Sequence, residues 1–119
     1  MLLQEPNLKV WLYNAPADMR RQIDGLAALA QTKMQCRANS GELFVFVNRK
    51  RTYMKVLYYS KGGFCLWCKR LEQGRFHQTG RKAGEEKMPL SWAQLQCLID
   101  GINWEKAPKN KRYDPDTLI

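Results

Sequence analysis

Basic side chains crowd the middle third of the chain, and the chemistry they suit is the neutralisation of phosphate groups. Between positions 49 and 82 there are ten lysines and arginines and one acid, Glu72, whereas basic and acidic residues balance elsewhere. The formal charge of +9 therefore comes from this segment, which indicates a localised surface for a polyanion such as DNA. A solvated face without a specific ligand is the alternative. The candidate phosphate contacts are Arg49, Lys50, Arg51, Lys55, Lys69, Arg70, Arg75, Arg81 and Lys82.

Four cysteines could bind a metal or do redox chemistry, but their spacing favours structural positions. Cys65 and Cys68 form a C-x-x-C motif inside an apolar run typical of a strand, where residues three apart point to opposite faces. No second C-x-x-C follows, and His77 is the only histidine. Because free cysteines are among the most buried residues, we expect core cysteines, no metal site and no cofactor.

Catalytic groups do not assemble into a recognisable site. His77 has no cysteine or serine at a diagnostic spacing, and the aspartates, including Asp18 and Asp100, form no metal-binding motif. Two-metal nucleases need several converging carboxylates. The phosphate-binding motifs G-x-x-x-x-G-K-[ST] and G-x-G-x-x-G are absent from the sequence. The sequence therefore predicts a protein that is not an enzyme.

Two amphipathic helices are predicted from the spacing of apolar residues. The first covers residues 19–34, where apolar positions recur with helical periodicity, and Asp18 is its expected N-cap. The second covers residues 92–100. It begins with an S-x-x-Q capping box from Ser91 and ends before Gly101, which suits a left-handed stop.

A β-sheet is expected to carry most of the basic residues. A short strand is predicted at 9–13, and aromatic and β-branched runs at 42–47, 53–59 and 64–71, joined by short links, predict an antiparallel meander. We expect one face to pack on the helices and the other to expose interleaved basic and aromatic side chains to solvent. The aromatic residues assigned to the core are Phe44, Phe46, Phe64 and Trp67.

The elements together predict a single α+β domain over residues 1–107, an antiparallel three- to four-stranded sheet packed with two amphipathic helices. Residues 78–87 are expected to form a mobile polar loop, and residues 108–119 a flexible polar tail. The longest purely apolar run, 43–47, is far shorter than the roughly 20 residues of a membrane span. The N-terminal residues lack the features of a signal peptide, so we expect a cytoplasmic protein.

Several sequence blocks, in one order, resemble a known family. They include SGELFVFVNRKR (40–51), KVLYY (55–59), GFCLWCKRLEQGRF (63–76) and LIDGINW (98–104). Together with blocks around 10–29 they resemble the small TnpB-type accessory protein, from the second reading frame, of the insertion-sequence family numbered sixty-six. The resemblance implies a bacterial mobile element whose separate, larger protein is a DDE-type transposase. It implies an accessory role in transposition and brings no catalytic residues, and the C-x-x-C cysteines are not part of the family pattern.

Three functional hypotheses follow. The first is a non-catalytic DNA-binding accessory protein that contacts the element ends, with the transposase of the same element as a partner. The second is an adaptor that binds this transposase without substantial DNA contact, for which Arg20 and Trp104 are candidate contacts. The third is a small metal-dependent nuclease using Asp18 or Asp100. Base specificity, strand preference and oligomeric state are left open by the pattern.

Overall fold

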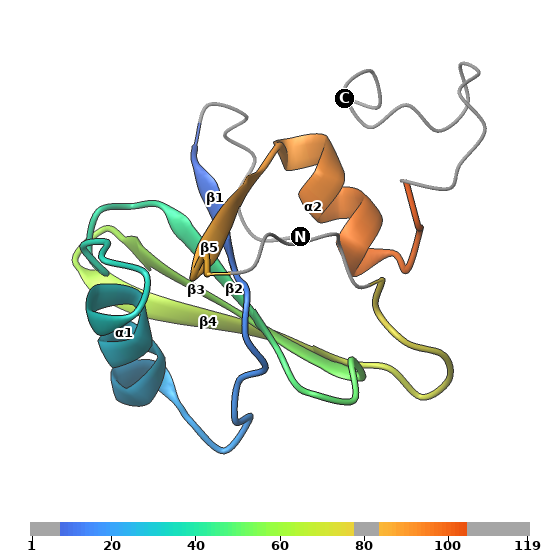
Figure 1. Ribbon diagram of the computed structural model, residues 1–119. Coiled ribbons are helices and arrows are strands. Elements are labelled where there is room, and N and C mark those ends of the chain that lie inside the picture. Colours follow the sequence, from blue (N-terminus) through green and yellow to red (C-terminus); the bar gives the residue numbers. More distant parts are fainter. Residues whose placement is uncertain (1–7, 78–83, 105–119) are drawn as a thin grey trace.

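A mixed five-stranded sheet forms the centre of the protein in a computed structural model that describes residues 8–77 and 84–104 (Figure 1). The pairs β2–β3, β3–β4 and β1–β5 are antiparallel, and β1–β2 is parallel. The strand order across the sheet is β4-β3-β2-β1-β5. The strands are β1 (Val10–Tyr13), β2 (Leu43–Val47), β3 (Tyr53–Ser60), β4 (Gly63–Arg70) and β5 (Lys87–Leu90).

The prediction of an antiparallel sheet with three or four strands is therefore corrected in two respects. Strand β1 joins the sheet parallel to β2 because the connection between them, which contains α1 (Ile23–Thr32), returns the chain to the end where β1 began. Strand β5 was not expected, since it is short and contains Pro89. It pairs only with β1 at the edge of the sheet, where a residue without an N–H is tolerated.

Each face of the central strands is covered by one helix, α1 on one side and α2 (Trp92–Ile99) on the other. Phe44 of β2 is fully buried in a cluster with Leu26 of α1. Its neighbours Leu43 and Val45 point to the opposite face and join a cluster with α2. The expected solvent-exposed face is thus absent from the central strands, because both faces are used to bury a helix.

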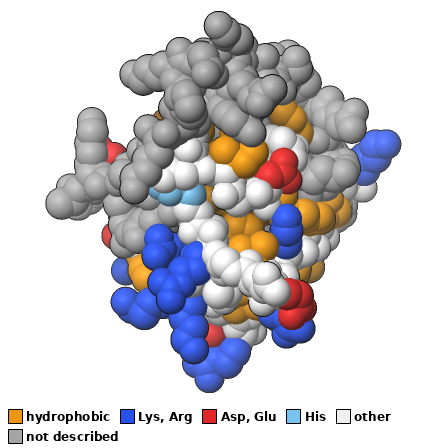
Figure 2. Space-filling model, turned by 90° about the vertical axis from the view of Figure 1, so that its right-hand side faces the viewer, with side chains coloured by type: hydrophobic (Ala, Val, Ile, Leu, Met, Phe, Trp, Pro, Cys, Tyr) orange, Lys and Arg blue, Asp and Glu red, His pale blue; other side chains and the backbone are white. Residues whose placement is uncertain are grey.

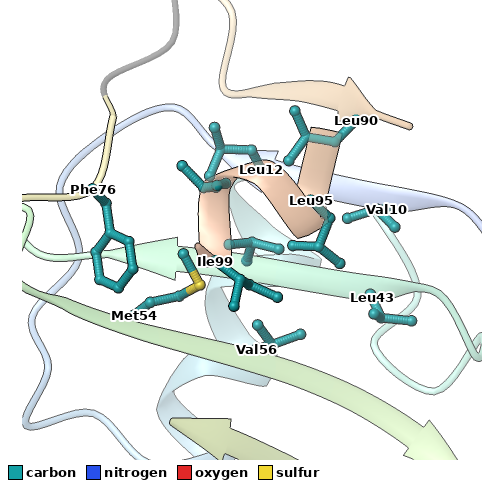
Figure 3. Packing of buried hydrophobic residues seen from close by; sticks show 11 residues of the cluster. Val10, Leu12, Leu43, Met54, Val56, Phe76, Leu90, Leu95 and Ile99 are labelled. Atoms are coloured by element: carbon teal, nitrogen blue, oxygen red, sulfur yellow. The ribbon is translucent and has the colours of Figure 1, made fainter. Parts of the chain in front are cut away.

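Helix α2 has the predicted position and capping. The Ser91 Oγ accepts from the Gln94 amide at 3.0 Å, and the Gln94 Oε1 accepts from the Ser91 amide at 2.9 Å. This reciprocal pair satisfies two amides at the start of the helix, and Gly101 follows its end with a φ of 77°. Figure 3 shows Leu95 and Ile99 projecting from α2 into the cluster below it.

Helix α1 is shorter than the predicted range of 19–34. It begins at Ile23 after Gln22, whose side chain makes no capping bond. Asp18 is not the N-cap, because its carboxylate accepts from the Arg20 amide at 2.9 Å and pairs with the Arg20 guanidinium at 2.7 Å. Those hydrogen bonds lower the pKa of Asp18 to about 2 and stabilise a turn before the helix.

Strand β4 forms an edge of the sheet, since among the strands of the described residues it pairs only with β3. Phe64 on this strand is 36% exposed, so its predicted core position is wrong, and its ring packs edge-on against Tyr59 at 5.0 Å. Trp67 is half-buried against the α2-side cluster. The core positions of Phe44 and Phe46 are confirmed, because both are fully buried.

Parts of the predicted organisation lie outside the described residues. One part is residues 78–83 of the predicted loop, which hold the candidate phosphate contacts Arg81 and Lys82. The other parts are the predicted domain boundary at 107 and the predicted tail 108–119. Within the two described ranges, no helix has both the length and the apolar character needed to cross a membrane.

Candidate nucleic-acid interface

The turn between β2 and β3 holds three consecutive basic residues in a fixed loop. The Arg51 amide donates to the Asn48 carbonyl at 3.0 Å, which closes the turn. The Asn48 Oδ1 accepts hydrogen bonds from the backbone amides of the two residues that follow Arg51, at 2.9 and 3.1 Å. Arg49 and Lys50 occupy the tip and are exposed. The side chain of Asn48 therefore stabilises the backbone of the turn that carries these cations.

Arg51 occupies a backbone conformation that usually belongs to glycine. Its φ is 58°, in the left-handed region that costs a residue with a Cβ about 1–2 kcal/mol. A turn of this kind commonly ends in such a left-handed residue, most often glycine. The arginine at this position is thus held beside its two basic neighbours at a conformational cost.

The segment after β4 folds against the basic turn. The Leu71 amide donates to the Thr52 carbonyl at 2.8 Å, and the Phe76 amide donates to the Arg51 carbonyl at 2.7 Å. The Phe76 ring is 1% exposed and anchors the segment in the α2-side cluster. Arg75, the residue before this anchor, is exposed and lies next to the turn as a result.

Five cations therefore meet at one end of the sheet, which we call the basic end. Figure 2 shows Lys and Arg side chains gathered on this side of the molecule, next to the histidine. Within the described part of the chain, no ion pair or side-chain hydrogen bond engages any of the five. The basic end consists of Arg49, Lys50, Arg51, Arg70 and Arg75.

Two predicted phosphate contacts, Lys55 and Lys69, are engaged elsewhere. Lys55 is 2% exposed, and its ammonium group donates to the carbonyls of Met19 and Arg21 at 2.8 and 2.9 Å. Lys69 is half-buried and donates to the Ile99 carbonyl at 2.8 Å, where a cation complements the C-terminal end of α2. Because main-chain carbonyls occupy both ammonium groups, neither belongs to the basic end.

A pocket of about 90 Å³ opens beside the basic end. Arg49, Arg51 and His77 contribute to its lining, together with apolar side chains such as Val47 and Leu98. The pocket lies where the ends of β1 and β2 meet α2 and the segment after β4. It was not predicted, because these contributions come from distant parts of the sequence.

The most buried polar residue of this pocket is Asn14, at 6% exposure. Its Nδ2 donates to the Glu85 carbonyl at 3.1 Å. Its Oδ1 is buried and accepts no hydrogen bond from the described residues, an arrangement that costs about 1–3 kcal/mol. In the sequence, Asn14 is only the first residue of a turn after a strand, so nothing marked it as a site residue.

The cysteines do not gather into one cluster in the described part of the chain. Cys65 and Cys68 lie opposite Tyr58 and Lys55 in the register of β4 with β3. Their side chains point to opposite faces of the sheet, as predicted. Cys97 is buried, and burial raises the pKa of its thiol, but Cys68 is exposed on the edge strand and is not a core residue. In residues 8–77 and 84–104, no group of three or more His, Cys, Asp or Glu side chains could hold a metal ion.

The two acids considered for a nuclease are occupied by structural roles. Asp18 pairs with Arg20 before α1, and Asp100 accepts from the Gln96 Nε2 at 3.2 Å at the end of α2. The structural observations thus define a small basic α+β protein with a cationic surface at one end of its sheet that no acid of the described residues pairs with.

The chain belongs to the IS66 Orf2-like family, whose model matches residues 8–109. It is 36% identical over 104 residues to "Uncharacterized protein y4hO" of Sinorhizobium fredii, covering 87% of this chain and 89% of the relative. It is 26% identical over 102 residues to "Uncharacterized protein y4jC" of the same organism, covering 86% of each. No solved structure gives a significant match. The family confirms the resemblance and makes this a transposition-associated accessory protein of an insertion sequence.

Proposed function

We propose that the protein is a non-catalytic accessory factor that binds DNA through its basic end. The observation that carries this proposal is the meeting of five cations at one end of the sheet without an acidic partner in the described residues. Lysines and arginines placed on phosphates release condensed counterions, which supplies affinity for any DNA sequence. By holding the element ends, the protein would help the transposase of the same element assemble on them.

The rigid frame of the basic end supports this proposal. The turn and the segment after β4 are joined by main-chain bonds, so the backbone that carries the cations is fixed before a ligand binds, and less loop entropy is lost on binding. A turn that only connected two strands would be more stable with glycine at position 51. The arginine there instead adds a cation to the surface, and strained positions of this kind cluster at functional sites.

An adaptor that binds the transposase without substantial DNA contact is the second candidate. The observation that favours it is the unpaired edge of β4, which exposes Phe64 and could accept a strand from another protein. Arg20 remains a candidate contact, with a side chain 92% exposed in its pair with Asp18. Trp104 is half-buried, and its ring packs on His77 at 5.5 Å.

A charge-reversal variant tests the DNA-binding proposal. Arg49→Glu, Lys50→Glu and Arg51→Glu together should weaken binding to a labelled duplex by about 100-fold or more, with an unchanged circular dichroism spectrum.

The matched control reverses the charge of three exposed cations at the other end of β2, the end at which the strand begins. There the Leu43 amide donates a hydrogen bond to the Lys9 carbonyl. This control carries Lys9→Glu, Lys33→Glu and Arg37→Glu. It has the same net charge as the test variant and should bind within about threefold of the wild type. Equal losses in the two variants would contradict a localised interface. A transposase pull-down that survives nuclease treatment, with no DNA binding, would favour the adaptor.

A further inference from the structure

The outer edge of β4 carries a row of main-chain groups that face away from β3. The two-residue turn between β3 and β4 has positive φ values of 50° and 84° at Lys61 and Gly62, as in the turns that close tight hairpins. Gly63 after the turn is therefore hydrogen-bonded to Ser60. Such bonded pairs alternate along an antiparallel ladder, and no strand of the described chain lies beyond β4. The residues whose amides and carbonyls point outward are Phe64, Leu66, Cys68 and Arg70.

The two edges of the sheet differ in their protection against a further strand. Strand β5 at the other edge is four residues long and contains Pro89, and both short length and proline hinder strand addition. Strand β4 is eight residues long, contains no proline and keeps an unbroken register with β3. Phe64 and Cys68 are exposed along it. An edge of this length without such protection is a surface for strand addition.

The distribution of charge along β4 suits a second copy of the same strand. Lys69 and Arg70 at its end are its only charged residues, and positions 63–68 are uncharged. When two copies pair in an antiparallel manner, the charged end of each strand lies beside the uncharged end of the other. A parallel pair would bring the cations together, and like charges directly opposite one another destabilise a sheet.

We propose that two copies of the protein associate through antiparallel pairing of β4 about a two-fold axis at Leu66. Facing residues of an antiparallel pair share one side of the sheet, so a two-fold axis perpendicular to the sheet must pass through a residue and not between two. An axis at Leu66 pairs residues 63–69 of the two copies. In this register Phe64 of one copy faces Cys68 of the other, so the two exposed uncharged side chains of the strand cover each other.

This symmetry places the two basic ends at opposite ends of the dimer. Arg70 belongs to the basic end and is the last residue of β4. In the Leu66 register it lies opposite position 62 of the other copy, so the two Arg70 residues are about 26 Å apart along the strand direction. A dimer therefore holds two DNA segments, one at each basic end, a consequence that rests on the proposed DNA-binding function.

Sedimentation equilibrium of the wild type without DNA tests the association. The expected species is a dimer with twice the 13.9 kDa mass of one chain. A wild type that stays monomeric up to about 100 µM, where even weak dimers are populated, would overturn the inference. The edge of β4 would then be left for a strand of another protein, as in the adaptor hypothesis.

Paired substitutions at positions 64 and 68 test the register. The two side chains are exposed, and within one chain they are about 13 Å apart, too far to pair with each other. Phe64→Lys with Cys68→Lys puts lysine opposite lysine at two places across the interface and should give a monomer with an unchanged circular dichroism spectrum. Phe64→Lys with Cys68→Glu puts opposite charges at the same places and should dimerise about tenfold more tightly than the first variant.

A matched control separates this pairing from the change in net charge. Phe64→Lys with Asn39→Glu has the same net charge as the second variant, but its acid lies in the exposed turn before β2. This control should associate as weakly as the variant with two lysines. Equal dimerisation of the control and the Phe64→Lys, Cys68→Glu variant would contradict the Leu66 register.

Two duplexes with different labels test the consequence for DNA. The wild type should hold both labels in one complex, whereas the Phe64→Lys, Cys68→Lys variant should bind each duplex singly. Equal capture of the second duplex by both proteins would contradict bridging through β4. The two proposals fail separately, because a dimer that binds no duplex refutes only DNA binding, and a monomer that binds duplex DNA refutes only the association.

Discussion

The main-chain amide of Phe76 donates to the carbonyl oxygen of Arg51 at 2.7 Å. This hydrogen bond ties the segment after β4 to the turn between β2 and β3, although the two are separated by the whole β3–β4 hairpin. Because the Phe76 ring is anchored in the core, the bond fixes Arg75 relative to the basic turn. The basic end is therefore part of the folded frame and not a set of independent surface cations.

Phe76→Ala should weaken DNA binding without removing a charge. Truncating a fully buried phenylalanine costs about 3–5 kcal/mol of unfolding free energy, and the loss here also frees the segment that carries Arg75. We expect a lower melting temperature and, at a temperature where the variant is still folded, about a tenfold weaker affinity for duplex DNA. Wild-type affinity in a folded variant would show that Arg75 needs no such anchor.

Arg51→Gly should separate stability from binding. Glycine relieves the left-handed strain at φ 58°, although its greater freedom in the unfolded chain offsets part of the gain. We expect the free energy of unfolding to rise by about 0.5 kcal/mol and DNA affinity to fall because one phosphate contact is lost. Denaturant titration and fluorescence anisotropy measure the two effects. Arg51→Ala, which keeps the strain, should lose affinity without gaining stability.

Lys55→Met and Arg70→Met should have opposite consequences, although both residues point to the α1 side of the sheet. Lys55→Met leaves the carbonyls of Met19 and Arg21 without their donor, so unfolding free energy should fall by about 2–4 kcal/mol. Arg70→Met changes an exposed side chain and should alter stability by less than about 0.5 kcal/mol while weakening DNA binding. The reverse pattern would place Lys55 in the interface.

The carboxyl group of Asp18 should titrate with a pKa of about 2, held down by hydrogen bonds from Arg20. A pKa lowered by folding stabilises the native state above the ordinary value of 3.8, and this contribution is lost as the pH falls through about 2. The effect on stability is small because the pair is exposed. Arg20→Gln should return the pKa toward 3.8 in an NMR titration, and an unchanged value would contradict the assigned cause.

Local patterns in the sequence predicted the elements well where neighbouring residues determine them. The capping box at Ser91 and the left-handed stop at Gly101 were predicted and are present, because both depend on residues within one turn of α2. The first helix was predicted too long, since Met19 fits the apolar periodicity but lies in the turn stabilised by Asp18 and Arg20.

Long-range pairing could not be predicted in the same way. The parallel β1–β2 pair and the edge strand β5 depend on which distant segments meet, and neither leaves a local signal. The same limit explains Lys55. Its alternation with aromatic residues predicted a solvent-exposed face, whereas the segment before α1 covers its side chain in the structure. The cations at positions 49–51, 70 and 75 were predicted as phosphate contacts. The strand pairings bring the turn and Arg70 to the same end of the sheet, but the position of Arg75 beside them depends on the Phe76–Arg51 hydrogen bond.

The salt dependence of duplex binding measures how many phosphates the basic end contacts. For duplex DNA, the slope of log affinity against log salt concentration is about −0.9 for each phosphate contacted. Contact by all five cations of the basic end predicts a slope of about −4.5 for the wild type and about −2 for a variant with glutamine at positions 49, 50 and 51. Equal slopes for the two proteins would show that this turn does not contact DNA, and the basic end would not be the DNA-binding surface.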